Sequence, residues 1–178
     1  MYPLLHFYLG IVTVFASIYG YGKIFNRNND DFFIFLCGYI FVGLVAIIFH
    51  FFIAINIWIS SSILLFGIFL FVYKNKKVNF IFHLPVILIF STLLISNTDH
   101  PIDANLYHHP YVSYLKIEKI ILGIANIHSR FGHISFLQFS QSATTNNLLT
   151  IYSISNINII FYYLFIIFCG KIIFQKNT

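Results

Sequence analysis

Long runs of apolar residues separated by short polar turns organise most of this chain. Residues 4–21 form the first run, and residues 32–73 form a second run without a charged side chain. The second run is about twice the roughly 20 residues that one crossing of a bilayer needs, so it predicts a helical hairpin with its turn near residues 50–60. Further runs cover residues 78–96 and 148–173. We therefore predict one all-α membrane domain over residues 1–178, a polytopic helical bundle of about five spans near residues 4–21, 32–52, 57–73, 78–96 and 148–173.

The basic residues give this bundle an orientation. Hydrophobic residues make up 59% of the chain and charged residues 8%, which is typical of membrane proteins and makes the lipid bilayer the expected partner. Seven of the ten Lys and Arg face one side if the 23–31 turn, the 74–77 turn and the C-terminus are cytoplasmic. The N-terminus and the 97–147 loop are then extracytoplasmic, and we expect a bacterial inner membrane. Because the net charge of +5 comes from residues that flank apolar runs, we expect no nucleic-acid partner.

The 97–147 loop holds most of the polar side chains. Five of the eight histidines lie there, and its Gly and Pro residues exclude a membrane span. Apolar residues recur at helical spacing over residues 111–122, with Lys116 and Lys119 on the other side, which predicts a short interfacial helix. Pro110 predicts a break before this helix, and Gly123 predicts a turn after it.

Asp103 is the first candidate for chemistry in the loop. A carboxylate there can act as a general base or a metal ligand, with Tyr107 and His108 one turn later to meet a hydroxyl and a phosphate. The alternative is a helix cap that also contributes surface charge. Arg130, together with the two lysines, could grip a diphosphate, and attraction to lipid head groups is the alternative.

The histidines could in principle bind a metal. His108, His109, His128 and His133 carry imidazole ligands that suit zinc, but their spacing matches no zinc signature. We therefore expect no cofactor and no metal site, with a divalent metal as the alternative. His50 and His83 lie singly in different apolar runs, which favours packing or a turn position over haem ligation.

Two segments of the loop carry a resemblance. Asp103-x-x-Leu106-Tyr107-His108-x-Pro110 and Gly123-Ile-Ala-Asn126-Ile-His128-x-Arg130-Phe-Gly132-His133-x-Ser135 resemble the loop of large bacterial multispanning proteins of cell-envelope polysaccharide loci, which are likened to O-antigen polymerases or GT-C glycosyltransferases. The resemblance implies catalytic roles for Asp103, Tyr107 and His108, and substrate-binding roles for Asn126, His128, Arg130 and His133. It also implies a polyprenyl-phosphate-linked saccharide as substrate and other envelope-assembly proteins as partners. Because those proteins have more spans, this chain is expected to be a truncated or partial version.

Two functions from different classes remain open at this point. The first is an enzyme, a polyprenyl-phosphate-linked sugar transferase or polysaccharide polymerase that uses the loop residues. The second is a non-catalytic membrane subunit or scaffold, of which a small respiratory-complex-like subunit is a variant. The two differ in whether Asp103 and the basic residues of the loop converge.

Overall fold

The computed structural model describes residues 2–25, 30–74, 83–96, 108–121, 123, 126, 129, 135–146 and 156–175. These residues form helices and connecting turns, and they contain no strand, which confirms the all-α prediction. The helices are α1 (Tyr2–Phe25), α2 (Asp31–Phe52), α3 (Ile57–Lys74), α4 (Leu84–Ser96), α5 (His109–Ile117), α7 (Phe136–Thr144) and α8 (Asn156–Gln175).

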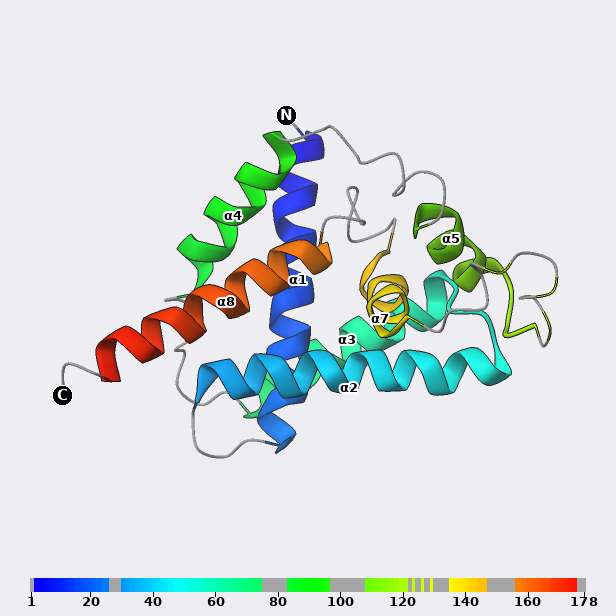
Figure 1. Cartoon of the computed structure of the whole chain (residues 1–178), viewed down its shortest axis with the longest axis horizontal. Helices are drawn as coiled ribbons and strands as arrows, with labels where there is room; N and C mark the ends of the chain where they lie inside the picture. Colours follow the sequence, from blue (N-terminus) through cyan, green and yellow to red (C-terminus); the bar gives the residue numbers. More distant parts are fainter. Residues whose placement is uncertain are drawn as a thin grey trace.

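Helix α1 runs through the centre of the molecule. It packs against α2, α3 and α4, and α2 crosses it in Figure 1. Helices α4 and α8 pack on each other on one side, whereas α5 and α7 lie beside the far end of α2. The short helices of the loop are thereby held against the long apolar ones.

Aromatic side chains fill the space between these helices. Phe15 of α1, Phe35 of α2 and Tyr163 of α8 are at most 1% exposed. The ring of Tyr163 lies 5.3 Å from that of Phe15 and 4.9 Å from that of Phe35, both edge to face. Because such ring pairs add to the free energy of burial, they fix α1, α2 and α8 to one another.

Small residues allow α1 and α3 to approach closely. A Cβ added to Gly20 would collide with the carbonyl oxygen of Gly67, and a Cβ added to Gly67 would collide with Ser17 Oγ. Small residues at helix crossings are typical of membrane proteins, where packing rather than the hydrophobic effect holds helices together. The sequence of this crossing therefore fits a bilayer.

Three helices are long and apolar enough to cross a membrane: Leu5–Phe25, Asp31–Phe52 and Ile57–Lys74. The turn predicted near residues 50–60 is present, because α2 ends at Phe52 and α3 begins at Ile57. The apolar stretches of α4 and α8 are shorter, Leu84–Leu93 and Ile159–Ile173. The number of spans and the side on which the loop lies therefore stay predictions.

Candidate functional site

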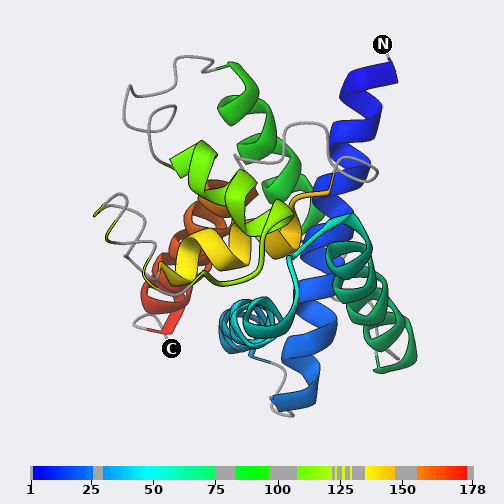
Figure 2. The same ribbon diagram turned by 90° about the vertical axis from the view of Figure 1, so that its right-hand side faces the viewer.

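Helices α5 and α7 form a polar layer over the end of α2. Figure 2 shows them side by side, and α7 also packs on α2 and α3. Helix α5 begins at His109 with Pro110 in its first turn, where proline costs no hydrogen bond, so the predicted break is the start of the helix. The predicted helix over residues 111–122 is shorter than expected. It ends at Ile117 because Glu118 is extended, with φ −117° and ψ 148°.

Hydrogen bonds fix the segment around Glu118 to the α2–α3 turn. The Ile55 N–H donates to Leu115 O (2.9 Å), and the Ile120 N–H donates to His50 O (3.1 Å). His50 Nε2 donates to Glu118 O at 2.9 Å, because a carbonyl can only accept. His50 is 2% exposed and packs against Phe139, which supports the packing predicted for it.

The C-terminal part of α7 is polar and yet buried. Its buried polar residues, with the two that follow, are Ser140, Gln141, Ser142, Thr144, Thr145 and Asn146. Asn146 Nδ2 donates to Ile57 O and to Ser60 Oγ, both at 3.2 Å. These bonds join the end of α7 to the first turn of α3, so the polar side chains hold α7 against α3.

Lys116 belongs to the interior of this layer. Its Nζ donates to Thr145 O at 3.0 Å, and burial lowers the pKa of Lys116 to about 8. Lys119 is exposed. Lys116 therefore has a partner within the protein, and a joint grip of the two lysines on a diphosphate stays a prediction.

Two of the predicted site residues lie within the described part of the chain. His108 directly precedes α5 and is exposed, and its Nδ1 accepts from Gln138 Nε2 at 3.0 Å. Asn126 is exposed, and its N–H donates to Gly123 O at 2.9 Å. Gly123 has φ +84°, which confirms the turn predicted there. The remaining predicted residues lie outside the described residues: Asp103, Tyr107, His128, Arg130 and His133.

The His108–Gln138 contact joins the beginnings of α5 and α7. His108 and Pro110 end the first motif segment, and Ser135, the N-cap residue of α7, ends the second. Gln138 lies in the first turn of α7. The points at which the two motif segments enter their helices are therefore next to each other.

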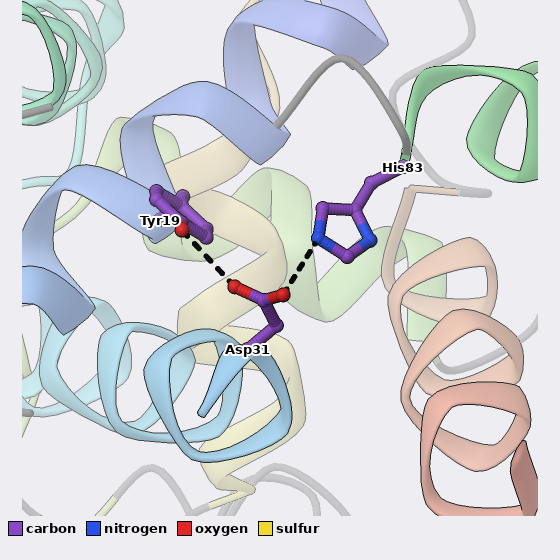
Figure 3. Close-up of polar contacts among 3 residues, drawn as sticks. All are labelled: Tyr19, Asp31 and His83. Atoms are coloured by element: carbon purple, nitrogen blue, oxygen red, sulfur yellow. Dashed lines mark hydrogen bonds and ion pairs between the residues drawn. The ribbon is translucent and has the colours of Figure 1, made fainter. Parts of the chain in front are cut away.

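A second polar cluster lies at the opposite end of α2 (Figure 3). Tyr19 OH of α1 donates to Asp31 Oδ1 at 3.0 Å, and His83 Nε2, just before α4, lies 3.1 Å from Asp31 Oδ2. The His83 ring packs edge to face on Phe35 and Tyr163. The helices α1 and α2 and the residue before α4 therefore meet at one carboxylate.

Sequence reasoning assigned Asp31 to a polar turn and His83 to an apolar run without relating them. A signal did exist, because an ionisable residue inside or beside an apolar run needs a partner to be tolerated there. In the described residues, His, Cys, Asp and Glu do not come together in a group of three that could hold a metal ion. What the cluster shows is a hydrogen bond and an ion-pair contact at one carboxylate.

An apolar groove of about 700 Å³ opens beside the α1–α3 crossing. It is lined mostly by aromatic and aliphatic side chains of α1, α2 and α3, including Tyr21, Phe41, Phe49 and Phe66. The hydroxyl of Tyr21 donates to Ile63 O at 2.7 Å and is therefore already satisfied. Such a lining suits a hydrocarbon chain.

Comparison with known proteins places the whole chain in one family. The model of a domain of unknown function, DUF8201, matches residues 2–178. The chain belongs to this family. Neither the curated proteins nor the solved structures contain a match to it.

In this DUF8201 chain, ionisable side chains lie at both ends of α2. Asp31 begins this helix and His50 lies in its last turn. At 1.5 Å per residue the helix is about 33 Å long, which is close to the thickness of a hydrocarbon core. Asp31 and His50 are therefore separated by most of the length of α2.

Proposed function

We propose that this protein is an integral membrane component of a polyprenyl-phosphate-linked sugar transferase or polysaccharide polymerase, in a bacterial inner membrane with the 97–147 loop extracytoplasmic. Asp103 acts as the general base, with Tyr107 and His108 beside it. Asn126, His128, Arg130 and His133 bind the substrate. The observation that carries the proposal is the hydrogen bond between His108 and Gln138.

This hydrogen bond matters because sugar transfer needs side chains from both halves of the 97–147 loop. A carboxylate can take a proton from an acceptor hydroxyl, but holding a phosphate leaving group needs a cation or other donors. Tyr107 directly precedes His108, and His133 precedes Ser135 by two residues. A contact between the starts of α5 and α7 therefore favours convergence of Asp103 from one segment and Arg130 from the other.

The membrane setting supports the same proposal. A polyprenyl carrier has a long hydrocarbon tail and an anionic head, so its enzyme needs an apolar surface next to a polar one. The groove between α1, α2 and α3 reaches Phe49, which is the neighbour of His50 beneath the polar layer. Hydrocarbon and polar surfaces thus adjoin at this end of α2.

The test is sugar transfer from a polyprenyl-phosphate-linked donor in membrane vesicles that contain the protein. Asp103→Asn keeps the size of the side chain and much of its capping capacity, so the protein should stay folded while transfer falls by about 10²–10⁴-fold. His133→Ala should lower the rate of transfer less than Asp103→Asn does. Glu118→Gln is the matched control, because it neutralises an exposed carboxylate of the same loop outside both motif segments.

Equal rates for Asp103→Asn and Glu118→Gln would refute the assignment of Asp103. A wild-type protein that transfers no sugar, but copurifies with other envelope-assembly proteins, would favour the non-catalytic subunit or scaffold instead.

A further inference from the structure

The geometry at Asp31 makes the strength of its contact with His83 depend on charge. His83 Nε2 is close enough to Asp31 Oδ2 for an ion pair, but it makes no well-aligned hydrogen bond with any described atom. A neutral imidazole would therefore contribute little to this contact. A protonated imidazole is attracted to the carboxylate over the 3.1 Å distance regardless of the exact N–H direction.

Burial of the His83–Asp31 pair makes the contact depend more strongly on charge. The side chains of His83 and Asp31 are 16% and 24% exposed, and the rings of Phe35 and Tyr163 cover the imidazole. Water therefore screens the pair less than it screens a fully exposed one. The bond from Tyr19 holds the other carboxylate oxygen in place, so Asp31 cannot easily turn away from His83.

The pair also lies where α2 and α4 begin. Helix α4 packs on α1 and α8, and His83 lies immediately before it, whereas Asp31 begins α2. The contact thus ties the N-terminal end of α4 to the start of α2 (Figure 3). Beside it, Asp30 pairs with Lys171 and ties α8 to the same point.

We propose that His83 and Asp31 form a pH-sensitive clasp that holds α4 against α2 in acid and loosens as the pH rises. This inference does not depend on the proposed sugar-transfer function. The charged and titratable groups around the pair are Tyr19 and Lys23 of α1, Asp30 before α2, and Tyr163 and Lys171 of α8. Among these side-chain types, imidazole is the one whose charge ordinarily changes between about pH 5 and 8.

Hydrogen–deuterium exchange of α4 in the full-length protein tests the clasp. The protein is placed in phosphatidylcholine and phosphatidylglycerol nanodiscs, and exchange is normalised to the intrinsic rate at each pH. In the wild type the protection of α4 should fall about tenfold between about pH 5 and 8, the range over which the charge of imidazole side chains ordinarily changes. Asp31→Asn and His83→Gln should show low protection at both values.

Asp30→Asn is the matched control. It removes the neighbouring carboxylate, so it should loosen α8 and leave the pH dependence of α4 in place. Equal protection of wild-type α4 at both pH values would overturn the proposal. So would a pH dependence that survives in Asp31→Asn. If Asp31→Asn does not fold, His83→Gln decides, because it removes the imidazole and leaves Asp31 with its hydrogen bond from Tyr19.

Discussion

Replacing Gly67 with alanine should force α1 and α3 apart. The new Cβ would overlap Ser17 Oγ and lie 2.8 Å from both Ser17 O and Tyr21 Cε2. The hydroxyl of Ser17 can rotate away, but its carbonyl oxygen belongs to the backbone of α1 and cannot. Overpacking of this kind costs about 1–3 kcal/mol, whereas the better helix propensity of alanine returns about 1 kcal/mol. Because a backbone atom is involved, we expect a net loss of about 2 kcal/mol.

Gly170→Ala provides the matched control for this change. A Cβ at Gly170 meets no atom within 4 Å, so the substitution should gain up to about 1 kcal/mol from helix propensity alone. The two variants should therefore differ by about 3 kcal/mol in the free energy of unfolding. Unfolding of the purified protein by dodecyl sulfate, followed by far-ultraviolet circular dichroism, measures this difference. Equal stability of the two variants would refute the close approach of α1 and α3.

Three further changes probe the polar layer. Burial lowers the pKa of Lys116 from 10.5 to about 8, so the folded protein gives up this proton before the unfolded chain does. Stability should rise between these two pH values in the wild type more than in Lys116→Met, as urea titrations at several pH values will show. Asn146→Ala should lower the free energy of unfolding by about 1–3 kcal/mol in the same titration, because Ser60 Oγ loses a donor in a buried place. Ser113→Cys should react with a membrane-impermeant maleimide added outside spheroplasts, and labelling from the cytoplasmic side alone would refute the predicted topology.

The helical hairpin could be predicted because its signal is local. The uncharged run over residues 32–73 is too long for one crossing and too apolar for a loop, so only the position of its turn was open. The structure places the turn at Asn56, whose Oδ1 accepts from the N–H groups of Trp58 and Ile59 at the start of α3. The length of the apolar run was sufficient to predict the two helices.

The length of α5 and the existence of α7 could not be predicted, because distant contacts decide them. The apolar spacing of α5 continues past Ile117, but hydrogen bonds to His50 and Ile55 draw the backbone into an extended path. The sequence of α7 is too polar to indicate a buried helix, and it is buried because Asn146 finds partners on α3.

The candidate site was predictable only in part for a similar reason. The motif segments indicated His108, but nothing in them indicated Gln138 as its partner, since Gln138 follows the second segment. The pairing of Asp31 with His83 likewise depends on how α1, α2 and α4 meet, which residue spacing does not encode.

The buried polar face of α7 has a consequence for biogenesis. A nine-residue helix with this many hydroxyl and amide groups is too short and too polar to partition into lipid as an independent segment. Its hydrogen-bond acceptors are on α3 and its packing partners are on α2, so both must already be inserted when it docks. We therefore expect α7 to dock after α2 and α3 are in place, so that closure of the polar layer is a late folding step. Until that step is complete, the Ile57 carbonyl and the Ser60 hydroxyl lack the amide donor of Asn146.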